Sequence, residues 1–539
     1  MAISSYSPGG NSGSRVLRVA ELALMICSFS NKRDYVNLLY LCRDAYVTIL
    51  PLVWEEVDLI WVLHLIPELK YDGYQLESPK PYRSFYFGTI VNLARFNVHS
   101  PLVKIVRTGN ITSIRFPNKW PAFKSLSEPS PLLPNLQRLI VNDICILFDY
   151  PWIFLTPNLL ELRMIDEKSE KYEDDARNQI SQCDAELDAH SCAYLIDWIS
   201  HSCPRLEKLR LFPSNQSSTP NKLAHSAYDN LANLTNLRSF TLVMSDVYDN
   251  VFQALDQLPH LEELILIGTS QCLSAPDPIT LADGSFPHLQ YLGLYGLCES
   301  STARICKAAP LFRHLIKVDV IYSEPDAESF MDYDRTIAAL ESIGHNTPHL
   351  KDITIYPRGN YGYFVAILPV VDLFKQMSLT RLDLGYTIFN PQEVGYDEGD
   401  WGYEGDEITR NSSLEAQWTA FLSAVPRLEE LRLEQQGFWE VQLERMASLL
   451  PNLRLLVAQI VWFVGPSEEV NASQTIVIRS QLHLYPHQSI PEIVANVYRL
   501  WPNAIWEPNA AESESDQEWA NCTPAELNDA LRVLRSKAK

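Results

Sequence analysis

Basic side chains are scarce in this sequence. Its 539 residues include 44 Lys and Arg against 66 Asp and Glu, which gives a formal net charge of −22. Proteins that coat a phosphate backbone do so with clustered Lys and Arg. The surplus of carboxylates therefore argues against nucleic acid as a partner.

Long apolar runs and paired cysteines are also missing. No stretch reaches the roughly 18 consecutive apolar residues that a membrane span requires, and Glu21 interrupts the run 15–28, the best candidate for a secretory leader. The ten cysteines are scattered without a C-x-x-C pair, a pattern typical of buried thiols in a reducing compartment. We therefore expect a cytoplasmic or nuclear protein with no membrane contact.

The strings that mark common catalytic and cofactor sites are absent, including G-x-S-x-G, the P-loop, G-x-G-x-x-G, H-E-x-x-H and the EF-hand. Two His-x-Cys pairs, His190 with Cys192 and His201 with Cys203, are offset by eleven residues. That offset is about 16 Å along a helix, whereas zinc ligands lie within about 2.3 Å of one ion. We expect no enzyme activity, no cofactor and no metal site.

What the sequence does contain is a repeat. Each copy consists of an apolar residue, two variable residues, a second apolar residue, one variable residue and a third apolar residue. Apart from two double-length gaps, successive copies start 23 to 35 residues apart, close to the leucine-rich period. The copies start at Ile111, Leu136, Leu159, Leu206, Leu237, Leu261, Leu289, Leu315, Leu350, Leu379, Leu428 and Leu453.

Prolines and helical spacing show how each repeat is built. In eight copies a proline stands two residues before the first Leu, where it ends a helix and favours extended geometry. Segments between copies, such as 251–258, 333–343 and 441–450, carry apolar residues at helical spacing. Each repeat is thus a strand plus a helix that buries its apolar face against its neighbours. We predict an α/β leucine-rich-repeat solenoid, a horseshoe with strands on its concave face.

The remaining segments surround this body. We predict a disordered polar tail at 1–15, a small all-α module at 16–57, the solenoid at 58–505, and an acidic linker with a short C-terminal helix at 506–539. Thr523, Pro524 and Glu526 form the start signal of that helix.

The two double-length gaps contain insertions. Residues 166–188 are strongly charged, and residues 386–410 combine aromatic side chains with carboxylates and glycines. Loops on a rigid scaffold often carry recognition. A solvated insertion that binds nothing explains the composition equally well.

Residues 16–57 show a different pattern from the repeats. Apolar residues fall at helical spacing from Val19 to Phe29, SNKRD interrupts them, and a second apolar face runs from Tyr35 to Ile49. The pattern predicts a helical hairpin. At about 40 residues such a hairpin is small to fold alone, so we expect it to pack on the solenoid or on a partner.

Four fragments of this module resemble the F-box of fungal F-box/leucine-rich-repeat proteins: Val19-Ala20-Glu21-Leu22, Ile26-Cys27-Ser28-Phe29, Leu41-Cys42-Arg43 and Val53-Trp54-Glu55-Glu56-Val57. The twelve-residue step from Cys42 to Trp54 matches the step in that family. The chain departs from the family at Ala20, where a proline is usual, and at Ala45, where a tryptophan is usual. The order of the fragments, followed by a leucine-rich body, supports the resemblance.

The resemblance implies a noncatalytic substrate-recognition subunit of an SCF-type cullin-RING ubiquitin ligase. The module would dock on the Skp-type adaptor while the repeats bind a protein substrate. The matched adaptor-binding candidates are Val19, Leu22, Ile26, Phe29, Leu41, Cys42, Tyr46 and Trp54. The alternative is a leucine-rich-repeat interaction scaffold without a ligase, in which the module caps the solenoid.

The concave face is the expected substrate-binding surface. Side chains alternate along a strand, so the two variable residues that flank the second apolar position face this side. Across the twelve copies these positions hold eight basic and six acidic residues. We predict that a protein substrate contacts this face at Arg138, Arg163, Lys208, Arg210, Tyr291, Lys317, Arg381 and Arg432. Salt bridges between neighbouring strands explain the same charges equally well.

Overall fold

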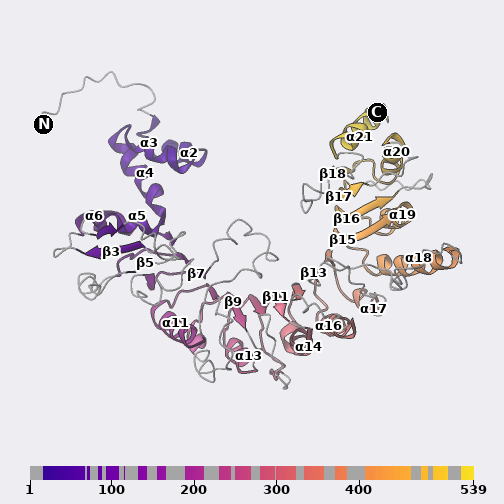
Figure 1. The fold of residues 1–539 in the computed structure, drawn as a ribbon, viewed down its shortest axis with the longest axis horizontal. Coiled ribbons are helices and arrows are strands. Elements are labelled where there is room, and N and C mark those ends of the chain that lie inside the picture. Colours follow the sequence, from indigo (N-terminus) through magenta and orange to yellow (C-terminus); the bar gives the residue numbers. More distant parts are fainter. Residues whose placement is uncertain are drawn as a thin grey trace. The chain divides into compact units, whose positions relative to one another are not determined.

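The computed structural model describes residues 16–66, 69–72, 83–87, 93–108, 114–115, 131–141, 154–164, 189–211, 230–244, 249–268, 279–297, 299–322, 333–356, 371–384, 407–462, 475–482, 490–507 and 524–538. The predicted tail 1–15, the insertion 166–188, and most of the insertion 386–410 and of the acidic linker lie outside these residues. The chain forms two compact units, Met1–Leu242 and Val243–Lys539. Short strands alternate with helices in both units (Figure 1).

Three helices begin the first unit: α2 (Ala20–Ser28), α3 (Lys32–Leu39) and α4 (Arg43–Glu55). The predicted hairpin of two helices is therefore wrong, because the second apolar face is interrupted after Leu39. Asn31 starts α3 through a capping box with Asp34. The thiol of Cys42 starts α4 by accepting a hydrogen bond from the backbone N–H of Ala45.

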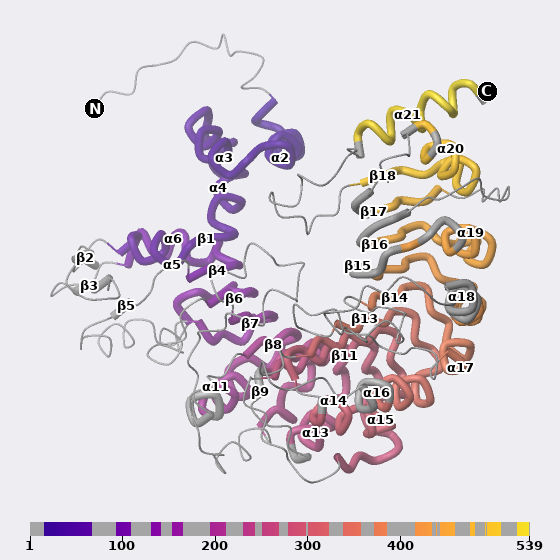
Figure 2. Tube along the Cα trace, turned by 45° about the vertical axis from the view of Figure 1, so that its right-hand side comes forward, coloured from indigo at the N-terminus to yellow at the C-terminus, as the bar shows by residue number. Residues whose placement is uncertain are grey.

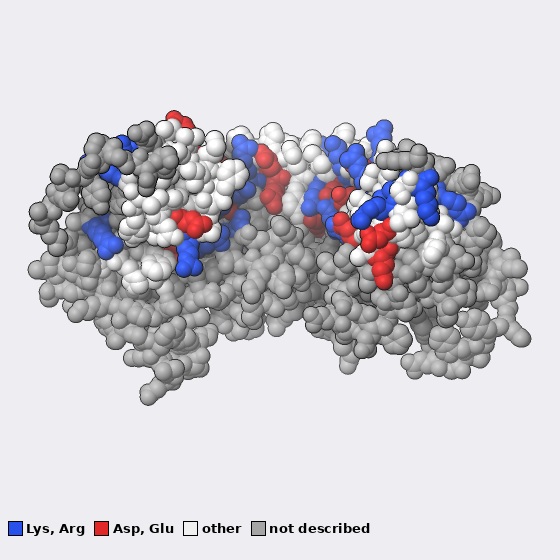
Figure 3. Space-filling model, turned by 90° about the horizontal axis from the view of Figure 1, so that it is seen from above, with Lys and Arg blue, Asp and Glu red and all other residues white. Residues whose placement is uncertain are grey.

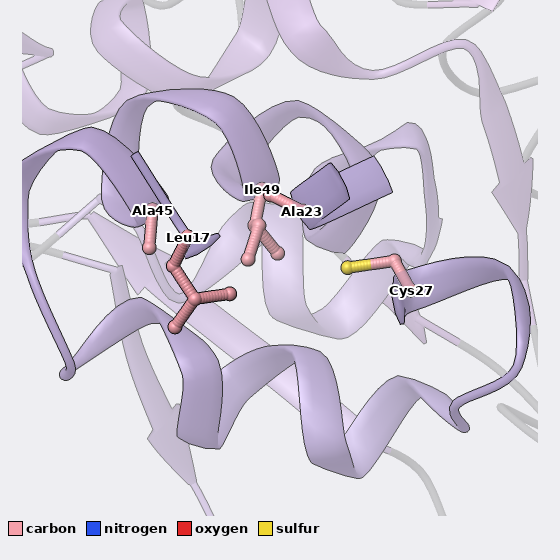
Figure 4. Close-up of a cluster of buried hydrophobic side chains, with 5 residues drawn as sticks. All are labelled: Leu17, Ala23, Cys27, Ala45 and Ile49. Carbon is pink, nitrogen blue, oxygen red and sulfur yellow. The ribbon is translucent and has the colours of Figure 1, made fainter. Parts of the chain in front are cut away.

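The interior of this helical module is small. Its buried side chains are Leu17, Ala23, Cys27, Ala45 and Ile49, which point toward one another between the helices (Figure 4). Ala45 is fully buried there, so the larger tryptophan that is usual in the F-box would not fit without movement of its neighbours. Six partly buried apolar side chains pack against this cluster: Tyr35, Leu38, Leu39, Cys42, Leu52 and Val53. Even with them the core is small for a fold that would stand alone.

Helix α4 passes directly into the first strand of the repeats. Strands β1 (Glu56–Asp58), β4 (Ile105–Arg107), β6 (Arg138–Val141), β7 (Glu161–Met164), β8 (Lys208–Leu211) and β9 (Ser239–Met244) pair in this order, all parallel. The helical elements among them are α5 (Leu59–Leu63), α6 (Ala94–His99), α11 (Ala189–Ser202) and the 3₁₀ turns η1 (Ser100–Leu102) and η3 (Asn230–Asn233).

The predicted first repeat copy, Ile111–Phe116, is wrong. Its strand β5 (Ile114–Arg115) pairs with β3 (Arg83–Phe87), which also pairs with β2 (Leu69–Asp72), in a separate three-stranded sheet. The parallel array instead takes β4, in the pattern Val103-x-x-Val106-x-Thr108. All three of these side chains are fully buried. Because Thr108 is polar, the pattern of three apolar residues did not identify this copy.

The described residues of the second unit form nine parallel strands, and each pairs with the next. Figure 2 follows the chain through β13 to β18. They are β10 (Glu263–Gly268), β11 (Tyr291–Leu297), β12 (Lys317–Tyr322), β13 (Asp352–Tyr356), β14 (Arg381–Asp383), β15 (Glu430–Trp439), β16 (Leu455–Trp462), β17 (Val477–Leu482) and β18 (Ile505–Glu507). The helices are α13 (Asp249–Asp256), α14 (Glu299–Cys306), α15 (Ala309–Phe312), α16 (Tyr333–Asn346), α17 (Val371–Phe374), α18 (Glu407–Ala424), α19 (Glu440–Leu449), α20 (Ile490–Leu500) and α21 (Pro524–Ala538).

The repeat pattern builds the core of both units. Eleven of the twelve predicted copies form strands of the parallel arrays, and the first Leu of each of the eleven is buried, as is the second apolar residue. Removing a Leu side chain from water contributes about 1.5 to 3 kcal/mol. The α/β leucine-rich-repeat prediction is confirmed, including the three helices expected at 251–258, 333–343 and 441–450.

At the C-terminal end, strands β17 and β18 were also not among the predicted repeat copies. Thr475 and Ser480 stand at the first and third key positions of β17, and Asn503 stands at the first key position of β18, by the register with β16. The buried apolar residues are instead Ile476 and Ile478 at β17 and Ala504 and Trp506 at β18, which stand two residues apart and not three. This shorter spacing does not fit the repeat pattern, so the sequence did not predict these two strands.

Candidate interaction surfaces

The helical module exposes an unusual amount of apolar surface. Of the nineteen large apolar side chains that are exposed in the described ranges, twelve lie between Val16 and Val47. They include six of the predicted adaptor-binding residues: Val19, Leu22, Ile26, Phe29, Leu41 and Tyr46. Phe29 is 89% exposed at the end of α2. Single exposed apolar residues are ordinary, but a concentration of them marks an interaction surface.

The other two predicted adaptor-binding residues are engaged inside the chain. Cys42 caps α4 and packs against the small core of the module. Trp54 is half-buried and stacks on His99, with ring centroids 4.6 Å apart. Burial, and then the nearby Arg95, lowers the pKa of His99, so this ring is neutral near pH 7. Trp54 thus links the module to α6.

Glu55 and Glu56 tie the same end of α4 to strand β4. The Glu55 carboxylate lies 2.9 Å from Lys104 Nζ, and the Glu56 carboxylate lies 2.6 Å from Arg107 Nε. The backbone carbonyl of Glu56 also accepts a hydrogen bond from Lys32. The module is therefore anchored on the first repeats at the junction of α4 and β1.

The open face of a strand is defined here as the face that carries the two variable residues beside the second apolar position. In the first unit, the open face of β6, β7 and β8 brings together four predicted substrate-binding residues, Arg138, Arg163, Lys208 and Arg210. Glu161 Oε2 lies 2.6 Å from Arg138 Nε, and its Oε1 lies 2.6 Å from Arg163 Nη2. One buried carboxylate therefore serves two arginines, while Lys208 is exposed on the next strand.

In the second unit, the open face of β13, β14 and β15 carries a network of ion pairs. Arg381 lies 3.5 Å from Asp352 (Nη1–Oδ2), 3.7 Å from Asp383 (Nη2–Oδ2) and 3.5 Å from Glu430 (Nε–Oε2). Arg432 is 3.7 Å from the same Glu430 (Nη2–Oε2). The pairs of Arg381 with Asp352 and with Glu430 join neighbouring strands, which is the alternative to substrate contact that the sequence suggested, whereas the other two pairs lie within one strand.

The other two predicted residues of the second unit, Tyr291 and Lys317, surround Asp319. Its Oδ2 accepts hydrogen bonds from the hydroxyls of Tyr291 at 2.7 Å and Tyr295 at 3.1 Å, and it lies 3.2 Å from Lys317 Nζ. Lys317 Nζ also stands 4.6 Å from the centroid of the Tyr291 ring. Burial, followed by the charges of its neighbours, raises the pKa of Tyr291 far above its usual range, so Tyr291 acts as a neutral donor.

Asp352 is the carboxylate that this arrangement satisfies least. Its Oδ1 is buried without a hydrogen bond. Burial is the main cause that raises its pKa to about 6, against the opposing effect of Arg381 and Lys317 and with help from Asp319 and Asp383. A buried charge with incomplete hydrogen bonding is costly, so folding favours the protonated carboxyl.

Two tyrosines on this face were not predicted from the sequence. Tyr295 donates to Asp319, and Tyr356 donates to the fully buried Asp383. Both follow the third apolar residue of their copies, a position that faces the same side as the two variable residues because side chains alternate. The alternation of side chains along the strand could therefore have predicted both positions from the sequence. In Figure 3 the described basic and acidic side chains occur as interleaved blue and red groups.

Of the two His-x-Cys pairs, the second has described side chains. His201 Nδ1 lies 2.7 Å from the carbonyl oxygen of Asp197 in its own helix, and burial raises the pKa of the Cys203 thiol to about 12. No group of three or more His, Cys, Asp or Glu in the described ranges is placed to bind a metal ion. Cys27, Cys42, Cys203 and Cys306 are free thiols. None of the helices in the described part of the chain has the length and apolar character to cross a membrane.

Comparison with known proteins gives distant likenesses. No family model and no curated protein matches the chain. The chain is similar to the yeast Rad7–Elc1 complex, with 11% identity over 69% of this chain and 81% of that chain and a TM-score of 0.30. It is also similar to a protein of Bacteroides fragilis, with 12% identity over 64% and 67% of the two chains and a TM-score of 0.25. The fold is α/β and leucine-rich-repeat-like. That conclusion rests on the strands described above.

Proposed function

We propose that this chain is the substrate-recognition subunit of an SCF-type cullin-RING ubiquitin ligase. In this proposal the helical module docks on a Skp-type adaptor and the repeats bind a protein substrate. The observation that carries the proposal is the apolar surface of α2 and of the segment that leads into α4. It coincides with the fragments that resemble an F-box.

The energetics of the module support a docked state. Its buried core has five side chains, two of them alanines, with six partly buried apolar side chains packed against it, while Phe29, Leu41 and their neighbours remain in water. Burial contributes about 25 cal/mol per Å² of apolar surface, so covering these side chains would add stability that the module lacks by itself. Large apolar side chains grouped on one helical surface are the usual anchors of helix-mediated contacts.

Adaptor capture tests the proposal directly. The full chain carrying Phe29→Asp, and separately Leu22→Asp with Ile26→Asp, should lose a Skp-type adaptor that the wild-type chain retains in a pull-down. Phe29 is almost fully exposed, so its replacement should leave the fold intact by circular dichroism. The matched control is Val98→Asp with Val533→Asp, two exposed apolar residues outside the module. Retention of the adaptor by the folded Phe29→Asp variant would contradict the proposal.

A second candidate function has its own supporting observation. The stacking of Trp54 on His99 and the ion pairs of Glu55 and Glu56 fasten the module to the first repeats. Such fastening is what a terminal cap of a protein-binding scaffold requires. A wild-type chain that captures protein partners but never the adaptor would favour this scaffold.

A further inference from the structure

We propose that His260 and His288, on neighbouring repeats of the second unit, bind a divalent transition-metal ion of the class that imidazole prefers, such as Zn²⁺ or Ni²⁺. The site goes beyond the proposed function and does not depend on it. The sequence predicted no metal site, because the common motifs are absent and the His-x-Cys pairs are too far apart. Three observations support the new site: a row of histidines, a contact between two of their rings, and a constrained turn beside them.

Histidine occupies the same position in four consecutive repeats. It directly precedes the first Leu of each copy, as His260, His288, His314 and His349. In the other seven copies that form parallel strands, this position holds Asn, Arg or Ser. Because β10 to β13 pair in sequence order, the four histidines follow one another from repeat to repeat. All four are exposed, so their ring nitrogens are open to an ion from solution.

The rings of His260 and His288 lie close together. Their centroids are 6.3 Å apart and their planes are 34° apart. Two residues further along, the N–H of Gln290 donates to the carbonyl of Glu262 at 2.8 Å, which joins the two backbones. Zn–N bonds are about 2.1 Å long, so two imidazoles on one tetrahedral ion have their centroids roughly 5 Å apart. The exposed rings therefore need to approach each other by roughly 1 Å, which small rotations about their side-chain bonds supply.

The backbone before His288 forms a constrained turn. Phe286 is buried and has a φ of 54°, in the left-handed region where a bulky residue is rare. Its N–H donates to Asp256 Oδ1 at 3.1 Å, and its carbonyl accepts from the N–H of Leu289 at 3.3 Å. Asp256 ends α13, four residues before His260. One repeat thus fixes the turn that presents the histidine of the next, and constrained backbone of this kind is concentrated at binding sites.

The chemistry of the pair favours a transition metal over other cations. Imidazole nitrogen is a usual ligand of Zn²⁺, Ni²⁺ and Cu²⁺, whereas Mg²⁺ and Ca²⁺ prefer oxygen. The formal net charge of −22 favours the approach of a cation. Two protein ligands leave two positions of a tetrahedral ion to water, so the site is weaker than zinc centres with three or four protein ligands. A bound ion would join two repeats and stabilise this part of the second unit.

Nickel binding by the full chain without an affinity tag tests the site, with Mg²⁺ as the control ion. The variants are His260→Asn and His288→Asn, because asparagine occupies the same position in four other copies and should preserve the fold. In each variant the site should bind Ni²⁺ at least tenfold more weakly, so equilibrium dialysis should show one ion fewer per chain. The double variant should lose no more than either single variant, because the two histidines share one ion.

The matched control is His349→Asn, which makes the same change at an exposed position two repeats further along. It should bind Ni²⁺ as wild type does. Wild-type binding by the folded His260→Asn or His288→Asn variant would overturn the proposal, as would an equal loss in the control. A double variant that loses twice as many ions as each single variant would show that the histidines bind independently, and would also overturn it.

A measurement on the wild-type chain needs no variant. Hydrogen exchange followed by mass spectrometry should slow in β10 and β11 when Ni²⁺ is added and should not change with Mg²⁺. Exchange in β15 to β18 should be the same with and without Ni²⁺. No slowing in β10 and β11, or equal slowing with Mg²⁺, would overturn the proposal. Because no adaptor is present, these outcomes are separate from those of adaptor capture.

Discussion

At the level of single residues, Asp352 shows how burial and charge oppose each other on a repeat surface. Arg381 and Lys317 favour its ionised form, but burial outweighs them and raises its pKa well above the usual range of a carboxyl group, to about 6. The folded protein therefore takes up a proton at Asp352 at a higher pH than the unfolded chain does. Proton binding at this site stabilises the fold.

The change Asp352→Asn tests this imbalance. A folded-state pKa above the unfolded value adds stability that is complete below about pH 4 and is lost as the pH rises through about 6. The asparagine variant should therefore be more stable than wild type at pH 7.5, by at most about 3 kcal/mol because one pKa unit corresponds to about 1.4 kcal/mol. Its advantage should vanish near pH 4. Urea unfolding at several pH values measures the difference, with the exposed Asp283→Asn as control. A constant difference between the two proteins across this range would exclude Asp352 as the titrating group.

Among the helices, strands and turns, the connections before each strand use one recurring contact. In the first unit an asparagine precedes the first Leu of three copies, and its Nδ2 donates to the carbonyl of the proline in the preceding repeat: Asn135 to Pro101, Asn158 to Pro134 and Asn236 to Pro204. Asn158 Oδ1 also accepts from Arg205 Nη1 at 3.1 Å. These side chains connect successive turns in the same way that backbone hydrogen bonds connect successive strands.

Replacing Asn158 by alanine should measure this contact. The variant loses hydrogen bonds to the repeats on both sides and should destabilise the first unit by about 1 to 2 kcal/mol, seen as a lower urea midpoint. Asn452 occupies the same Pro-Asn-Leu position in the second unit, where the described residues give its side chain no hydrogen bond, so Asn452→Ala is the control. Equal effects of the two changes would mean that the asparagine acts through local turn preference and not through the contact between repeats.

For the molecule as a whole, the arrays need protected ends. Helix α21 covers the last strand of the second unit: Leu527 and Leu531 are buried, and the Asn528 side chain pairs with both the N–H and the carbonyl of Trp506. Arg535 donates to the carbonyls of Pro502 and Ala504. An open strand edge invites pairing with other chains, so these contacts protect β18.

Removal of residues 524–538 should therefore loosen one end of the second unit. Each repeat contacts its neighbours alone, so the effect should decay along the array. Hydrogen exchange followed by mass spectrometry should speed up in β17, β18 and α20 and stay unchanged in β10 to β12. The control Val533→Ser alters an exposed position of the same helix and should leave exchange unchanged. Faster exchange throughout the second unit would show a single cooperative block instead.

The spacing of apolar residues along the chain was enough to predict the repeats. Residues such as Leu136 and Leu428 are buried because side chains alternate along a short strand and a helix follows that strand. The same local pattern placed Lys208 and Arg381 on the open face. It missed β4, where Thr108 replaces an apolar residue, and it missed β17 and β18, whose buried apolar residues stand two residues apart and not three.

Which charges meet could not be read from local spacing. The connection between β7 and β8 is far longer than most, yet it brings Glu161 and Arg163 beside Lys208 and Arg210. The neutralised network around Arg381 and the stack of Trp54 on His99 likewise join residues from separate elements. Whether a segment forms a strand, and which face of that strand a side chain occupies, depend on a few adjacent residues. Electrostatic pairing depends on distances across neighbouring strands, and these exist only after the chain has folded.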